Sequence, residues 1–97
     1  MLNDATLRER FSFIEGYRCG EYSGRIGNIG DPADNRLLSC TIDYSSPTGS
    51  KRRVNLSIFS ELLVPQHSDK LLRKLCLLVL NGVKQEVSLT ITSLDDL

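Results

Sequence analysis

Tryptophan is absent from this sequence of 97 residues, which has only three tyrosines, three phenylalanines, one methionine and one histidine. The single histidine, His67, lies in a polar stretch, and no second metal-binding side chain stands at a helpful spacing. No set of catalytic acid, base and nucleophile can be assembled from the other residues. The sequence therefore predicts a protein that is not an enzyme and that uses no metal or cofactor.

Long apolar runs are also missing. The longest, Leu75 to Leu80, has a third of the roughly 18 residues that a membrane span requires. The first residues, Met1 to Arg10, lack the apolar segment of a secretory signal. These two absences predict no contact with membranes and a cytoplasmic location.

Cysteine is scarce, and the count of three is odd with no paired spacing. This pattern favours reduced thiols over a disulfide framework. We expect Cys40 and Cys76 to be small core residues. Cys19 follows Arg18, which would lower a thiol pKa, but no histidine lies nearby, and a reactive role is not expected.

Net charge is zero, which argues against strong nonspecific binding to nucleic acid, because such binding comes chiefly from neutralised phosphates. The charge is spread unevenly. Residues 1–35 carry four Arg against six acids (−2), residues 36–74 carry seven Lys and Arg against three acids (+4), and residues 75–97 carry one Lys against three acids (−2). The densest positive charge is Lys51-Arg52-Arg53, where a local basic patch is expected.

The composition, 40% hydrophobic and 25% charged, is ordinary for a globular protein, and the length predicts one domain, residues 1–97. Residues 1–15 are expected to form a separate helical or loosely ordered lead. Apolar residues at helical spacing favour a short helix there: Leu2, Leu7, Phe11 and Ile14. Aromatic residues at even spacing favour an extended alternative: Phe11, Phe13 and Tyr17. Both interpretations stay open.

The central stretch, Arg36 to Phe59, contains two alternating apolar runs separated by a turn. The residues predicted to face inward are Leu38, Cys40, Ile42 and Tyr44 in the first run and Val54, Leu56 and Ile58 in the second. Between the runs, Pro47 and Gly49 are residues that turns favour. The pattern predicts an antiparallel hairpin.

Five glycines lie between Gly16 and Gly30, which in a strand indicates bends, bulges or close backbone approach. The spacing Gly24-x-x-Gly27-x-x-Gly30 differs from the dinucleotide-binding fingerprint, so a phosphate loop is not expected. The segment 31–35, Asp-Pro-Ala-Asp-Asn, is predicted to be a turn.

The C-terminal part is predicted to begin with a helix at about 68–76 whose apolar stripe is Leu71, Leu72, Leu75, Leu78 and Val79. The run 75–80 fits a buried helix and a buried strand equally, because it is apolar on every side. Asn81-Gly82 would accordingly end a helix or form a hairpin turn. A last strand is predicted from alternating Val87, Leu89 and Ile91.

The expected fold class is mainly β (α+β): a small five-stranded barrel of the oligonucleotide-binding (OB) type, or an antiparallel sheet, with one helix. Four segments look like their counterparts in the family of bacterial single-stranded DNA-binding protein and primosomal protein B: Gly24-Arg25-Ile26-Gly27, the Thr48-Gly49-x-Lys51 tip, Arg53-Val54-Asn55-Leu56, and Leu77-Leu78-Val79-Leu80-Asn81-Gly82. The likeness covers about three-quarters of the chain.

This resemblance implies a basic groove with aromatic platforms that binds single-stranded nucleic acid. The residues that it nominates are Lys51, Arg52, Arg53, Arg25, Arg36, Phe59 and Tyr22. The chain departs from the family in lacking tryptophan, which weakens the expectation of base stacking.

The other hypothesis is a protein-interaction module: a small subunit or adaptor, or a homodimer. Zero net charge, the short chain and the apolar run 75–80 favour it. The candidate interface residues are Leu77, Leu78 and Leu80. We take a non-enzymatic protein-binding module as the leading function, with a single-stranded nucleic-acid-binding accessory protein as the alternative.

Overall fold

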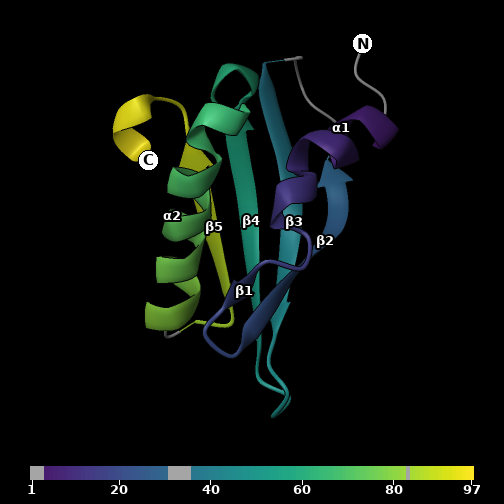
Figure 1. Cartoon of the computed structure of the whole chain (residues 1–97), viewed down its shortest axis with the longest axis vertical. Helices are drawn as coiled ribbons and strands as arrows, with labels where there is room; N and C mark the ends of the chain where they lie inside the picture. The colour runs from purple at the N-terminus through teal and green to yellow at the C-terminus, as the bar shows by residue number, and fades with distance from the viewer. Residues whose placement is uncertain (1–3, 31–35, 83) are drawn as a thin grey trace.

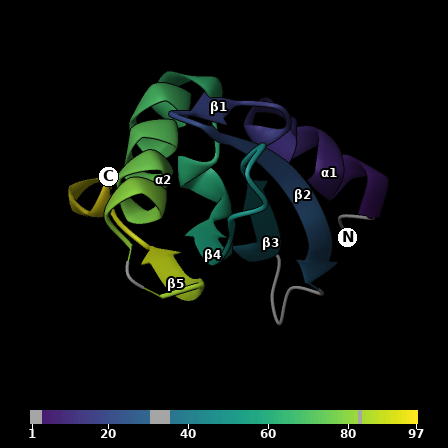
Figure 2. The same ribbon diagram turned by 90° about the horizontal axis from the view of Figure 1, so that it is seen from below.

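The computed structural model describes residues 4–30, 36–82 and 84–97. The helices are α1 (Asp4–Phe11) and α2 (Ser68–Asn81), and shorter 3-10 turns are η1 (Ser12–Ile14), η2 (Ser60–Leu62), η3 (Pro65–His67) and η4 (Leu94–Asp96). The strands are β1 (Arg18–Cys19), β2 (Tyr22–Gly30), β3 (Leu37–Ser45), β4 (Lys51–Phe59) and β5 (Glu86–Ile91). They form one sheet, in the order β1-β2-β3-β4-β5, which curls into a half-barrel with both helices on its concave side (Figures 1 and 2).

The first four strands run antiparallel to their neighbours, whereas β5 lies parallel to β4. The expected mainly β architecture is confirmed at this level, but the prediction of an antiparallel sheet is wrong for the last pair. The reason is α2, which carries the chain back along the sheet so that β5 starts at the same end as β4. Among the described residues, β1 and β5 are therefore the two edges of the sheet.

The predicted central hairpin is confirmed: β3 and β4 pair along their whole length, from Leu37 opposite Phe59 to Ser45 opposite Lys51. Every side chain predicted to face inward is buried, with at most 4% of its surface exposed: Leu38, Cys40, Ile42, Tyr44, Val54, Leu56 and Ile58. At the tip, Gly49 has a φ of 89°, and its N–H donates to the Ser46 carbonyl. The turn thus uses the one residue there that tolerates this conformation.

The ambiguous run 75–80 is helical, and α2 continues to Asn81 instead of ending near residue 76. Leu71, Leu72, Leu75 and Val79 form its buried stripe, while Leu78 is half-buried. A stripe with this spacing can be covered by the sheet only if the segment is helical. The alternative strand, and a hairpin turn at Asn81-Gly82, are therefore wrong.

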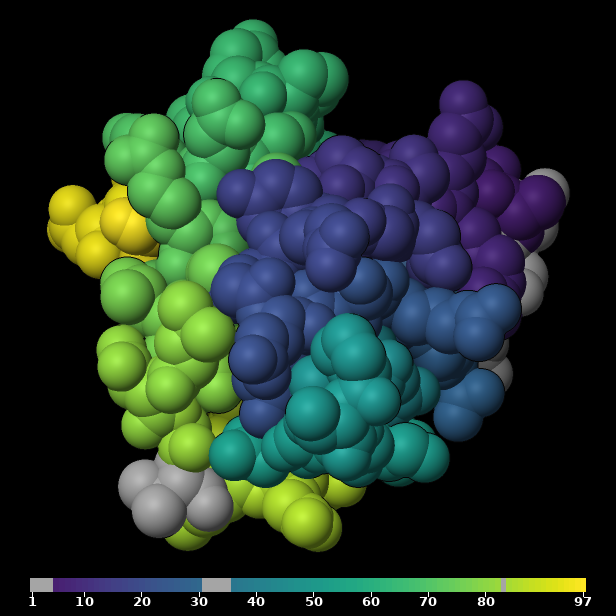
Figure 3. All heavy atoms as spheres, turned by 60° about the horizontal axis from the view of Figure 1, so that its bottom comes forward, coloured from purple at the N-terminus to yellow at the C-terminus, as the bar shows by residue number. Residues whose placement is uncertain are grey.

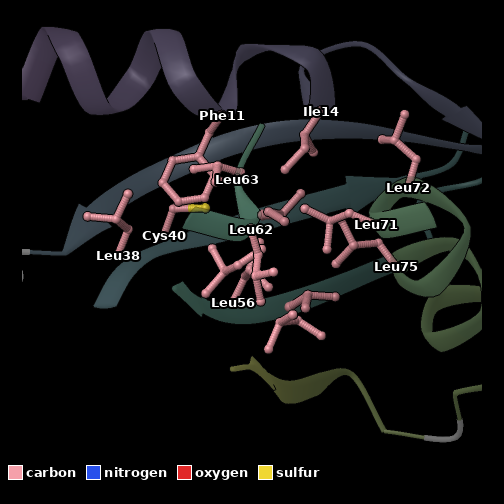
Figure 4. Packing of buried hydrophobic residues seen from close by; sticks show 14 of the residues in the cluster. Phe11, Ile14, Leu38, Cys40, Leu56, Leu62, Leu63, Leu71, Leu72 and Leu75 are labelled. Atoms are coloured by element: carbon pink, nitrogen blue, oxygen red, sulfur yellow. The ribbon is translucent and has the colours of Figure 1, made fainter. Parts of the chain in front are cut away.

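The N-terminal segment is helical, as one of the two interpretations predicted. Leu7, Phe11 and Ile14 are buried against the sheet, whereas Phe13 is only half-buried. The extended alternative is wrong for residues 4–14, and Leu2 lies outside the described residues. Figure 4 shows Phe11 and Ile14 pointing into the same core as Leu62 and Leu63 of the η2 region and Leu71, Leu72 and Leu75 of α2.

The glycine-rich strand β2 contains the predicted bulge. Its register with β3 shifts between Ile26 and Ile29, and the Asn28 N–H donates to the Thr41 hydroxyl at 2.8 Å instead of to the backbone of β3. A side chain at Gly27 would collide with that same hydroxyl, because a Cβ would lie 2.6 Å from the Thr41 oxygen. The predicted turn at 31–35 lies outside the described residues.

Cys19 on β1 and Cys76 on α2 form a disulfide, so the prediction of reduced thiols is wrong for this pair. The partners are separated by 57 residues, and only the packing of α2 beside β1 brings them together. Cys40 is a free, buried core residue, as expected. Within the described segments, no helix has the length and apolar character to cross a bilayer.

Candidate interaction surfaces

The predicted basic residues of the hairpin gather at one end of the molecule. Arg25, Lys51, Arg52 and Arg53 line a pocket of about 530 Å³, which we call the basic pocket. Figure 3 shows this end, where the tip of the β3–β4 hairpin lies beside the β1–β2 turn. The wall also carries two carboxylates, from Asp43 on β3 and Glu86 on β5. Four cations and two acids leave a local charge of +2.

Half of these cations are paired with carboxylates. Arg53 Nε donates to Asp43 Oδ1 at 2.8 Å, and this hydrogen bond is the main reason that the pKa of Arg53 rises above its ordinary value. Arg25 Nε lies 3.9 Å from Glu15 Oε1. Neither Lys51 nor Arg52 forms an ion pair with a described residue, so these two supply the uncompensated charge.

Tyr22, the nominated aromatic residue in this region, is contacted by Arg52. The guanidinium carbon of Arg52 lies 5.9 Å from the centroid of the Tyr22 ring, and the Tyr22 hydroxyl forms a 2.9 Å hydrogen bond with Ser50. Arg52 Nε is buried and has no hydrogen-bond partner among the described residues, while its terminal Nη1 donates to the Lys51 carbonyl. A base that stacks on this face of Tyr22 must displace Arg52.

Arg36 and Phe59 do not join the basic pocket. They lie at the opposite end of β3 and β4, where the Arg36 guanidinium carbon stacks 4.2 Å from the centroid of the Phe59 ring. The same guanidinium donates two hydrogen bonds to Glu61 Oε1, at 3.0 and 3.1 Å. The residues nominated for nucleic acid thus split into two groups, and only Lys51, Arg52, Arg53, Arg25 and Tyr22 lie together.

The convex face of the sheet, which we call the open face, is polar and is covered by no described helix (Figure 2). Three adjacent strands present polar side chains on this face: Ser39, Thr41 and Asp43 on β3, Arg53, Asn55 and Ser57 on β4, and Glu86, Ser88 and Thr90 on the edge strand β5. Side chains that alternate with period two reach this face from each strand. The sequence pattern indicated these orientations, but it gave no sign that the face is left uncovered.

The predicted interface leucines lie on the C-terminal half of α2. Leu77 and Leu80 are exposed by 57% and 54%, although Leu is usually buried. They stand three residues apart and therefore share one face of the helix; we call them the leucine patch. Leu80 reaches the β1–β2 turn, because a Cβ on Gly20 would lie 3.1 Å from its Cδ2. Leu78 is half-buried and packs against the core.

Sequence reasoning missed a second groove of about 530 Å³ between α1 and the η2–η3 region, lined partly by Phe13, Val64 and Pro65. Arg10 also lines it, and its Nη2 donates to the carbonyls of Ser60 and Leu63 at 2.6 and 3.0 Å. These contacts join segments about 50 residues apart, which no local sequence pattern reveals. These carbonyl contacts fix the position of the Arg10 guanidinium, which keeps its positive charge, at the edge of this groove.

No cluster of three or more His, Cys, Asp or Glu among the described residues is arranged to hold a metal ion. Comparison with known proteins adds no relative: no protein-family model matches this chain, no curated protein matches it and no solved structure matches it. What these surfaces do must therefore be argued from their own chemistry.

Proposed function

We propose that this chain is a non-enzymatic protein-interaction module, a small subunit or adaptor that binds a protein partner through the leucine patch. The observation that carries the proposal is the exposure of Leu77 and Leu80, which stand side by side on α2. Burying one leucine side chain stabilises a complex by about 1.5–3 kcal/mol, so two adjacent leucines can anchor an interface.

The support beneath the leucine patch favours the same function. Leu75 and Val79 on the opposite side of α2 are buried in the core, and the Cys76 disulfide ties the helix to β1. A partner therefore meets a helix that is already ordered, and little conformational entropy is lost on binding.

The test is quantitative affinity capture from cells of the source organism. We expect a Leu77→Ser, Leu80→Ser double variant to lose the partner that the wild type retains. The matched control is Leu94→Ser, since Leu94 is equally exposed, at 55%, but lies on η4. A partner that is retained by the double variant, or lost equally by the control, would contradict the assignment to this patch.

A second candidate function is the binding of single-stranded nucleic acid at the basic pocket, on a half-barrel of OB-like character. It is favoured by the position of Arg25, which is distant in the sequence from Lys51, Arg52 and Arg53 but lines the same pocket. Because only Lys51 and Arg52 lack a carboxylate partner, we expect weak binding whose salt dependence corresponds to about two phosphates. Fluorescence anisotropy of a labelled single strand, with the wild type and a Lys51→Ala, Arg52→Ala variant, measures it.

A further inference from the structure

One edge of the sheet is left bare. β5 pairs with β4 on one side, and no described strand lies on its other side. The Arg53 N–H donates to the Gln85 carbonyl at 2.7 Å. This bond determines which residues of β5 direct their backbone N–H and C=O groups toward β4. Because alternate residues point their backbone groups to opposite sides, those of Glu86, Ser88 and Thr90 point outward, away from β4.

The bare edge lacks the usual protections of an edge strand. It contains no proline and no bulge, and its one charged residue, Glu86, stands at the first position. Beyond the edge, η4 lies on the same side of the sheet as α2, as Figure 2 shows. Leu94 on η4 is 55% exposed. A strand added to β5 would thus gain both backbone hydrogen bonds and an apolar cover.

We propose that the occupant of this edge is a second copy of the chain, whose β5 pairs antiparallel with the first about a two-fold axis at Ser88. This register places Ser88 opposite its own copy and Glu86 opposite Thr90 of the partner subunit, so that polar side chains meet on the open face. Facing residues of this type exchange two backbone hydrogen bonds.

The same register matches the apolar side chains. Val87 comes to lie opposite Leu89 of the partner subunit, and both residues are half-buried at the margin of the core in the single chain. In the non-hydrogen-bonded pairs of an antiparallel ladder, facing side chains approach most closely. Each chain therefore covers the exposed part of the other's Val87 and Leu89.

Charge is also self-complementary along the edge. Lys84 stands just before β5, and the register brings it opposite Thr92 of the partner subunit. The Thr92 N–H donates to the Asp96 carboxylate at 2.9 Å, so negative charge is held at that end of the strand. An antiparallel pair thus places a cation near an anion at both ends, whereas a parallel pair would place like charges together.

Light scattering over a range of protein concentrations tests this inference against the monomer mass of 10.8 kDa. We expect the wild type to reach twice that mass, and Ser88→Pro to raise the dimer dissociation constant on the order of tenfold or more. Proline is tolerated here because the Ser88 N–H is not used within the chain. Ser88→Lys is a second variant for the case in which Ser88→Pro does not fold. It places two lysines face to face across the two-fold axis, and we expect the same rise in the dimer dissociation constant. Ser57→Lys, on the same face but one strand inward, should leave the dimer intact.

Amide hydrogen exchange supplies the positional readout. Protection that rises with concentration at Glu86, Ser88 and Thr90, and not at the ladder-bonded Val87 and Leu89, supports pairing through this edge. A wild type that stays monomeric, or a dimer that both Ser88 variants leave unchanged, would overturn the inference. Because the leucine patch lies on α2, partner capture through Leu77 and Leu80 can succeed or fail independently of this result.

Discussion

Asp43 on β3 and Arg53 on β4 stand directly opposite each other, and their side chains form a 2.8 Å ion pair on the open face. This pair removes one of the three positive charges of the basic hairpin. Glu86 on β5 stands on the other side of Arg53 and adds a second nearby carboxylate. The positive potential at this end therefore comes chiefly from Lys51 and Arg52.

We expect the Asp43–Arg53 ion pair to weaken the binding of anions at the basic pocket. Asp43→Asn keeps the shape of the side chain but releases Arg53, so we expect tighter binding of a labelled single strand and a salt dependence steeper by about one phosphate. Anisotropy titrations at several salt concentrations measure both quantities. Lys51→Ala should shift both in the opposite direction. If no strand binds at low salt, or if Asp43→Asn changes nothing, nucleic-acid binding at the basic pocket is wrong.

Gly24 is predicted to be intolerant of any side chain. A Cβ at this position would lie 2.9 Å from Tyr44 Cε1 and 3.2 Å from the Ile14 carbonyl oxygen, and Tyr44 is only 2% exposed. We expect Gly24→Ala to lower the free energy of unfolding by about 1–3 kcal/mol, because the ring and the backbone must both shift. Urea denaturation measures the change. Ser23→Ala, at the neighbouring position of β2, is the control and should cost much less.

Reduction of the Cys19–Cys76 disulfide should lower stability without abolishing the fold. The bond closes a loop between residues 57 apart, and such cross-links typically contribute about 2–4 kcal/mol by restricting the unfolded chain. Denaturant unfolding with and without a reductant, compared with a Cys19→Ser, Cys76→Ser variant, measures the effect. The variant should be insensitive to the reductant. Equal midpoints for the oxidised and reduced wild type would contradict this expectation.

Stability should fall at alkaline pH because of Cys40. Burial raises the pKa of this thiol from 9.0 to about 12, and the positive charge of Arg8 acts in the opposite direction. Between these two values the unfolded chain loses the proton while the folded chain keeps it, so the folded state binds more protons and stability decreases as pH rises. Below pH 9 this contribution is fully present.

Burial also raises the pKa of Tyr44, which adds to the loss of stability at higher pH. Denaturant midpoints measured across the alkaline range test the contribution of Cys40. Cys40→Ala should lessen the decline that begins near pH 9, even though the variant is less stable at neutral pH. A decline of unchanged slope in Cys40→Ala would assign the effect to other groups.

The core of the central hairpin could be predicted from sequence because alternation with period two fixes the side of each residue. Leu38 and Val54 needed no tertiary information. The end of α2 could not be predicted, because Leu75 to Leu80 is apolar on every side and only the sheet decides which leucines are covered. The Cys19–Cys76 bond and the direction of β5 likewise depend on how α2 packs, which no local pattern contains.

The arrangement of the candidate site could likewise be predicted only in part, and its function stays a proposal. Lys51 and Arg52 lie in the basic pocket, and their clustering was visible in the sequence. The pairing of Arg25 with Glu15, and of Arg36 with Glu61, joins residues 10 and 25 positions apart through the fold. Sequence reasoning counted those arginines as available charge because it could not place their carboxylates.

The most direct test of the proposed function is site-specific photo-crosslinking in cells of the source organism, with a photoreactive residue introduced in place of Leu77. A matched probe replaces Lys51 at the basic pocket, so that the two candidate surfaces report separately. The account predicts a discrete protein adduct from position 77 and none from position 51. No protein adduct at position 77, together with a nucleic-acid adduct at position 51, would contradict it.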